Sequence, residues 1–156
     1  MTRRILFVCM GDICRSPAGE GVMLRQVDQR DLTDQIVVDS AGTIGFHAGK
    51  PADPRMRSAA ARRGLNLTSH ARQVTGDDID AFDLLIAMDR ENQQDLFRLA
   101  GGQREHIRLL SDFLADDWPT DVPDPYYGGT EGFEYVLDMI ESACPTILDH
   151  LICRIS

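Results

Sequence analysis

Four short segments rich in Ile, Leu and Val recur along this 156-residue chain and constrain its fold more than any other feature. They cover residues 4–9, 35–40, 83–88 and 106–110, and the fourth is the weakest of them. Short apolar runs bounded by polar or turn residues are typical of strands that are buried on both faces. The sequence therefore predicts four buried strands.

Helical segments alternate with these strands. We expect helices over about residues 17–29, 55–63, 90–100 and 131–153. Residue types that begin helices precede the first three, namely Ser16-Pro17, Asp53-Pro54 and Asp89, whereas Pro145 is expected to kink or break the last helix. Alternating strands and helices are typical of α/β proteins. We therefore predict one domain over 1–156, a four-stranded parallel sheet flanked by helices on both faces.

Parallel sheets of this kind bind ligands beyond the carboxyl ends of their strands. Cys9 ends the first predicted strand, Phe46 follows the second and Asp89 ends the third. These three positions are therefore expected to converge on one edge of the sheet.

The segment VCMGDICRSP, residues 8–17, joins the first strand to the first helix. A cysteine thiol is mostly protonated at neutral pH, and a nearby cation and a helix N-terminus stabilise the nucleophilic thiolate. Arg15 can form two hydrogen bonds to an oxyanion, and Ser16 offers a hydroxyl group to the sulfur. Cys9 could instead be an ordinary buried cysteine, but Gly11 and the Ser-Pro pair favour a loop that holds a phosphate-like dianion.

Composition excludes several classes of function. The chain has 16 basic and 25 acidic residues, a formal charge of −9, which disfavours general nucleic-acid binding. We expect no membrane span and no secretory signal, hence a cytoplasmic protein whose four cysteines are reduced thiols. Scattered histidines and the absence of a C-x-x-C pair argue against a metal site.

Two motifs make the chain resemble the low-molecular-weight protein tyrosine phosphatases. The family pattern V-C-x-G-N-x-C-R-S-P matches residues 8–17, and its D-P-Y motif matches residues 124–126. Residues 39–43, 53–55, 71–73 and 87–89 are similar as well, so the resemblance covers essentially the whole chain. It implies the family's four-stranded parallel sheet, and an enzyme that uses neither a metal nor an organic cofactor.

The resemblance also implies a role for each matching residue. Cys9 would be the nucleophile that forms a phosphocysteine. Arg15 would bind the phosphate together with the other residues of the 10–15 loop, which are Met10, Gly11, Asp12, Ile13 and Cys14. Ser16 would stabilise the thiolate, and Asp124 would protonate the leaving oxygen. A phenol has a pKa of about 10, so a positioned acid speeds its departure by about 10²–10⁴-fold. Without the loop at 9–17, Asp124-Pro125 would be interpreted as a plain turn.

Aromatic residues on two loops are expected to form the walls of a cleft. Phe46, Tyr126 and Tyr127 suit a phenyl ring, although local packing is the alternative. Ile13 stands where relatives that act on phosphoarginine carry a smaller threonine, so it favours phosphotyrosine. The implied partner is a phosphotyrosine protein, and a kinase acting on Tyr126 or Tyr127 is a further hypothesis from relatives.

The chain departs from the family pattern at position 12, where Asp replaces Asn. Asp tolerates a left-handed backbone but lacks the two amide donors and can carry a negative charge. We therefore hypothesise that Asp12 disfavours the Cys9 thiolate and weakens oxyanion binding, unless it is protonated or paired. Ser40 and His70 are the residues expected behind the loop, and His70 is the candidate partner of Asp12.

The family also pairs residues matching Cys9 and Cys14 in a reversible disulfide, whereas Cys144 and Cys153 are expected to be packing residues. Two other functions remain open. An arsenate reductase of the same fold would need further cysteines, and residues 80–110 contain none. A phosphotyrosine-binding module that has lost catalysis would not need Cys9, Arg15 and Asp124 together.

Overall fold

The structure is a computed structural model that describes residues 2–153, except for the side chain of Tyr127. Its sheet contains strands β1 (Arg3–Cys9), β2 (Ile36–Gly42), β3 (Leu84–Ala87) and β4 (Ile107–Leu109). The strand order is β2-β1-β3-β4, and every pairing is parallel. The predicted four-stranded parallel sheet is confirmed. Strand β2 runs two residues further than expected, so Gly42 pairs with Cys9 at the edge that carries the site.

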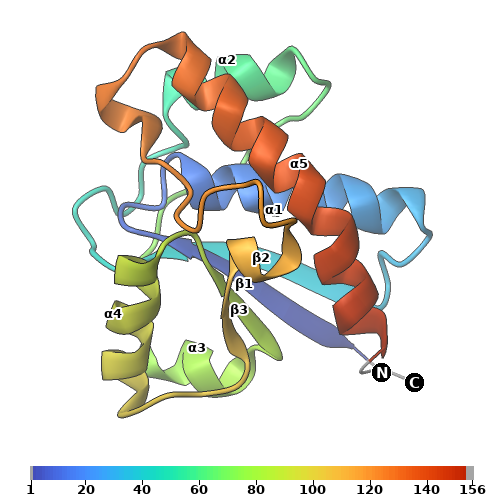
Figure 1. Cartoon of the computed structure of the whole chain (residues 1–156), viewed down its shortest axis with the longest axis vertical. Coiled ribbons are helices and arrows are strands. Elements are labelled where there is room, and N and C mark those ends of the chain that lie inside the picture. Colours follow the sequence, from blue (N-terminus) through green and yellow to red (C-terminus); the bar gives the residue numbers. More distant parts are fainter. Residues whose placement is uncertain (1, 154–156) are drawn as a thin grey trace.

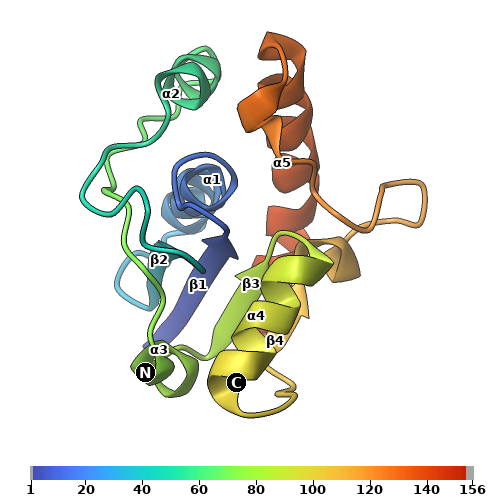
Figure 2. The ribbon, with the colours of Figure 1, turned by 90° about the vertical axis from the view of Figure 1, so that its left-hand side faces the viewer.

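Helices cover both faces of the sheet, as predicted. They are α1 (Arg15–Gln29), α2 (Pro54–Ala61), α3 (Gly76–Ala81), α4 (Arg90–Ala100) and α5 (Thr130–Cys153). Helices α1, α2 and α5 lie on one side of the sheet, and α3 and α4 lie on the other (Figures 1 and 2). Among the described residues, no helix is long and apolar enough to cross a membrane.

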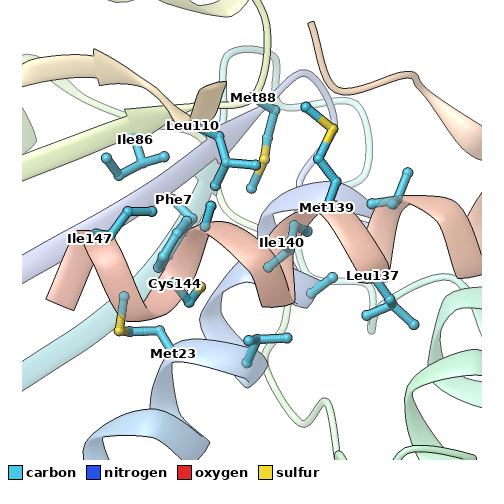
Figure 3. Close-up of a cluster of buried hydrophobic side chains, with 14 of the residues drawn as sticks. Phe7, Met23, Ile86, Met88, Leu110, Leu137, Met139, Ile140, Cys144 and Ile147 are labelled. Carbon is cyan, nitrogen blue, oxygen red and sulfur yellow. The ribbon is translucent and has the colours of Figure 1, made fainter. Parts of the chain in front are cut away.

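Strand residues alternate between two cores. Phe7 belongs to the cluster between the sheet and helices α1 and α5, whereas Leu6 belongs to the cluster under α3 and α4. Figure 3 shows Phe7 among the α5 side chains Cys144 and Ile147, all of them fully buried. Burying a side chain of this size contributes about 1.5–3 kcal/mol, so the central strand that ends at Cys9 is held firmly from both faces.

The start of α1 corrects the predicted cap. Cys14 is the N-cap and the helix begins at Arg15, so Ser16 does not cap the helix and Pro17 is its third residue. Pro17 is tolerated there because the first-turn amides have no partner within the helix. The Ser16 hydroxyl group instead bonds within the site described below.

The other predicted helix starts are correct. Asp53 accepts a hydrogen bond from the amide of Arg55 at 2.8 Å, and Asp89 accepts one from the amide of Asn92 at 2.7 Å. Helix α3 was not predicted because only six residues form it, although Thr75 and Asp78 make a capping box at its start. Helix α5 continues through Pro145, so the break considered there is absent.

Candidate active site

The loop between β1 and α1 turns its carbonyl groups away from its centre. Three amides outside the loop donate to these carbonyls: Thr43 N to Cys9 O at 2.9 Å, Ile44 N to Met10 O at 3.0 Å, and Asp53 N to Ile13 O at 2.8 Å. The C=O and N–H of a trans peptide point in opposite directions, and no peptide bond among residues 2–153 is cis. The amide that follows each carbonyl therefore points toward the hollow of the loop, where it can bind an anion.

Gly42 permits the close approach of β2 to this loop. A Cβ atom at position 42 would lie 2.7 Å from the carbonyl oxygen of Met10 and 3.0 Å from the amide nitrogen of Asp12. Both are backbone atoms that cannot move aside cheaply. Glycine at this position therefore lets the end of β2 support the loop without distorting it.

Cys9 lies at the base of a cavity of about 170 Å³ at the carboxyl end of β1. Its sulfur lies 3.0 Å from the Ser16 hydroxyl oxygen, and the residue is 3% exposed. The amino end of α1 begins at the same point, so its partial positive charge faces the thiol. The cavity is lined by Cys9, Met10, Gly11, Ile13, Cys14, Arg15, Ile44, Phe46, His47, Asp124 and Tyr126.

Arg15 is a buried cation fixed by acceptors on other segments. It donates to Asp89 Oδ2 at 2.6 Å and to the carbonyl oxygen of Val122 at 3.0 Å. Burial alone would lower the pKa of Arg15, but the neighbouring Cys9, Asp89 and Asp124 outweigh it and raise that pKa. The sequence predicts Asp89 as a helix cap at the shared edge but not its contact with Arg15. That contact arises because β3 pairs with β1 in the sheet.

Asp124 reaches the cavity from a distant part of the chain. Its Oδ2 lies 3.7 Å from Arg15 Nη2, and its Oδ1 accepts a hydrogen bond from the Tyr126 amide at 3.0 Å. The carboxylate is one-third exposed, so it lies at the mouth of the cavity rather than beside the buried sulfur. This position allows it to exchange protons with both a ligand and water.

The cavity walls contain two of the three predicted aromatic residues. Phe46 and Tyr126 line it, and Phe46 is 78% exposed, whereas the side chain of Tyr127 lies outside the described part of the structure. His47 was not predicted. Its ring packs edge-on against Phe46, with ring centroids 4.8 Å apart, and Ile44 adds a further apolar wall.

Asp12 is buried behind the loop with a left-handed backbone, φ = 57°. Its Oδ1 accepts a hydrogen bond from Ser16 at 2.7 Å, and its Oδ2 accepts one from the Arg72 amide at 3.0 Å. His70 is exposed, so the suggested pairing with Asp12 is wrong. The main-chain N–H of Arg72, two residues after His70, binds Asp12 instead. A main-chain donor cannot be recognised from the sequence, because every residue except proline has one.

Ser40 does lie behind the loop, as expected. It is 1% exposed, its hydroxyl group donates to Glu20 at 2.8 Å, and it also interacts with the Asp12 carboxyl group. Glu20 was not predicted to belong to this cluster. Ser40 therefore connects Asp12 to a second carboxyl group on α1.

The remaining cysteines differ in environment. Cys14 is buried beside the cavity, and burial together with the charge of Asp53 raises the pKa of its thiol. Cys144 is a core residue of α5, as predicted, whereas Cys153 is exposed, so its assignment as a packing residue is wrong.

Comparison with known proteins agrees with this geometry. The family model described as low molecular weight phosphotyrosine protein phosphatase matches residues 4–154. The low molecular weight protein-tyrosine-phosphatase of Streptomyces coelicolor is 41% identical over 152 residues, which cover 95% of this chain and 93% of that protein.

Two crystal structures show the same fold. A protein tyrosine phosphatase from Entamoeba histolytica with Hepes in the active site has a TM-score of 0.93 and 39% identity, covering 99% of this chain and all of that one. YfkJ from Bacillus subtilis has a TM-score of 0.93 and 38% identity, covering 99% and 97%. The chain therefore belongs to the low molecular weight phosphotyrosine protein phosphatase family.

Proposed function

We propose that this protein hydrolyses phosphotyrosine in proteins, and small aryl phosphates, through a phosphocysteine at Cys9. The observation that carries the proposal is the placement of three groups around one cavity. Cys9 is at its base beside Ser16, Arg15 is held in its wall, and Asp124 lies at its mouth. A nucleophile, an anion-binding cation and a proton donor are the groups that transfer of a phosphoryl group to sulfur requires.

In the first step, the loop amides and Arg15 bind the phosphoryl oxygens. The Cys9 thiolate attacks phosphorus while the bond from phosphorus to the phenolic oxygen breaks. Asp124 donates its proton to that oxygen, so the phenol leaves as a neutral molecule. The charge on the phosphoryl oxygens stays within the cradle of amides throughout, which stabilises the transition state.

In the second step, Asp124 acts as a base. Its carboxylate takes a proton from a water molecule, which attacks phosphorus as the bond between sulfur and phosphorus breaks. The electron pair of that bond returns to Cys9 as a thiolate, and inorganic phosphate leaves. One-third exposure of Asp124 supports this step, because water can reach the carboxylate.

Phe46→Ala tests the proposed aromatic wall. We expect KM for phosphotyrosine to rise several-fold with little change in kcat, because the ring binds the substrate but does not take part in proton or phosphoryl transfer. Ile44→Ala is the control for loss of apolar surface alone, and steady-state kinetics give the measurement. An unchanged KM in Phe46→Ala would show that the substrate ring lies elsewhere.

The substrate class is tested by comparing kcat/KM for phosphotyrosine, phosphoserine and phosphoarginine. The exposed Phe46 ring and the bulky Ile13 favour the flat aryl substrate, so phosphotyrosine should be the best of the three. Higher activity on phosphoarginine would contradict the assignment. Binding of phosphotyrosine without turnover would indicate a phosphotyrosine-binding module. Reduction of arsenate would indicate an arsenate reductase of the same fold.

Mild peroxide should produce a disulfide between Cys9 and Cys14. Both thiols are free and buried at the same loop. We propose that the protein is cytoplasmic, where the reducing environment keeps its thiols reduced at rest. Because the pKa of Cys14 is raised, formation of the bond should be slow at neutral pH and faster as the pH rises. Peptide mass spectrometry gives the measurement, and Cys14→Ser is the control. Sulfinic acid at Cys9 in the unmodified chain, without a disulfide, would contradict protection of the nucleophile.

A kinase partner is the remaining part of the proposal. Tyr126 is 38% exposed at the rim of the cavity, and the Arg55 guanidinium lies 5.4 Å from the centre of its ring. Phosphorylation there would place a dianion beside this cation, at the entrance to the site.

A further inference from the structure

The Ser16 hydroxyl group lies between two buried acids. Its oxygen is 3.0 Å from Cys9 Sγ and 2.7 Å from Asp12 Oδ1. A hydroxyl group has one proton to donate. If Ser16 donates it to an ionised Asp12, the sulfur faces lone pairs and is stable only as a thiol. If Ser16 donates it to a Cys9 thiolate, Asp12 Oδ1 faces those lone pairs and is stable only when it carries a proton.

The second oxygen of Asp12 decides where that proton lies. Oδ2 accepts a hydrogen bond from the Arg72 main-chain N–H at 3.0 Å. Because Oδ2 already accepts from this N–H and Oδ1 faces the Ser16 hydroxyl group, we place the proton of a neutral Asp12 on Oδ1. The two arrangements of the three groups therefore differ by the position of one proton.

We propose that Asp12 is a positioning residue that shares one proton with the Cys9 thiol through Ser16. When the thiol ionises, its proton passes to the Ser16 oxygen while the Ser16 proton passes to Asp12 Oδ1, so one proton in total moves from sulfur to carboxyl. The reactive enzyme then contains a Cys9 thiolate, a Ser16 hydroxyl group that donates to it, and a neutral Asp12. The inference rests on the proposed function only in that Cys9 is the nucleophile.

The surroundings disfavour a second negative charge at this place. Asp39 on β2 and Glu20 on α1 act electrostatically on Asp12, and Ser40 links Glu20 to it. The Arg72 guanidinium is shared between Asp39 at 3.1 Å and Asp78 at 2.9 Å, so only its main-chain N–H serves Asp12.

Two other groups around the loop act electrostatically on Cys9. They are Arg15, in the cavity wall, and the thiol of Cys14, while the His47 ring lies against Gly11. Burial, the largest cause, raises the pKa of Asp12, and the hydrogen bonds with Ser16, the Arg72 amide and Ser40 act in the opposite direction.

Asp12→Asn imitates the protonated state permanently. An asparagine can keep its carbonyl oxygen on the Arg72 N–H and direct its NH₂ group to Ser16. Ser16 must then always donate to the sulfur, and no carboxyl competes for the proton. The substitution preserves shape and tolerates the left-handed backbone at this position.

The test is the pH profile of Cys9 alkylation by iodoacetamide without substrate, read by mass spectrometry of the Cys9 peptide. The unmodified protein should show two steps, one for each proton lost by the coupled pair. Asp12→Asn should show one step, at a midpoint at least about one pH unit lower than the upper step of the unmodified protein, because a neighbouring like charge is absent. One step at the same pH in both proteins would overturn the proposal.

Asp39→Asn is the matched control. It removes a carboxylate from the same neighbourhood, but the hydrogen bonds of Asp39 run to the Ser40 amide and to Arg72. We expect two steps to remain in this variant. A single step would show that general charge, rather than the contact through Ser16, causes the effect, and it would overturn the proposal.

Thermal unfolding gives a second measurement that does not depend on alkylation. Because the folded pKa of Asp12 is raised, its ionisation costs stability as the pH rises above the ordinary value of an aspartic acid. Asp12→Asn should therefore exceed the unmodified protein in Tm at neutral pH, and the gap should shrink as the pH falls toward that value. A gap that does not change with pH would contradict the shared proton.

The alkylation and unfolding experiments need no turnover. Absence of phosphatase activity together with two-step alkylation would refute the proposed function alone. One-step alkylation in an active phosphatase would refute the shared proton alone.

Discussion

Cys9→Ser should lower kcat/KM for p-nitrophenyl phosphate and phosphotyrosine by roughly 10⁴–10⁶-fold, the scale seen when an enzyme loses its nucleophile. The serine hydroxyl group is not ionised at neutral pH and attacks phosphorus far more slowly than a thiolate. The cradle should remain intact, because the amides and Arg15 are held by contacts that do not involve the sulfur. Steady-state kinetics and titration with phosphate measure the two effects separately.

Cys153→Ser is the control for removal of a thiol, because Cys153 is exposed at the end of α5 and far along the chain from the loop. Its kinetics should match those of the unmodified protein. Phosphatase activity that survives in Cys9→Ser would contradict the assignment of the nucleophile. Loss of both turnover and phosphate binding would show that the substitution had damaged the loop itself.

Asp124→Asn should lower kcat for phosphotyrosine by about 10²–10⁴-fold, the usual contribution of a general acid. Asparagine can still accept the hydrogen bond from the Tyr126 amide, so the turn that presents it should persist. The loss should be much smaller for aryl phosphates whose phenols are more acidic, because these leave without a proton. A series of substituted phenyl phosphates measures this dependence.

Asp121→Asn is the matched control for Asp124→Asn. Asp121 lies three residues earlier in the same segment and pairs with the exposed Arg90 at 3.0 Å. Activity should change little in this variant. If Asp124→Asn instead slows all aryl phosphates equally, Asp124 positions the substrate or Arg15 and does not donate the proton.

Much of the fold could be predicted because the central strands β1 and β3 are buried on both faces and appear as apolar runs, whereas the outer strands β2 and β4 are partly exposed. Strand β1 alternates between the two cores at Leu6 and Phe7, and after Arg3 and Arg4 all its residues, 5–9, are apolar and buried. Helix α3 has no comparable signal, since it is short and buries only Asp78 and Ile79. The start of α1 was misjudged because Ser16 has the residue type of a cap but bonds within the site.

The site could be predicted where its residues are neighbours in sequence. Cys9 and Arg15 belong to one loop, and Asp124 was found through the family motif rather than from its spacing. The contact of Arg15 with Asp89 joins residues 74 positions apart, and Asp12 is bound by a main-chain amide 60 positions away. Neither contact leaves a local pattern, so both required the packed structure.

Rapid denaturation of the enzyme during turnover, followed by peptide mass spectrometry, tests for the phosphocysteine itself. We predict one phosphoryl group on the peptide that contains Cys9. The phosphorylated fraction should rise in Asp124→Asn with a substrate whose phenol is acidic, because the second step then lacks its base. Turnover without any phosphorylated Cys9, or with the phosphoryl group on another residue, would contradict the mechanism.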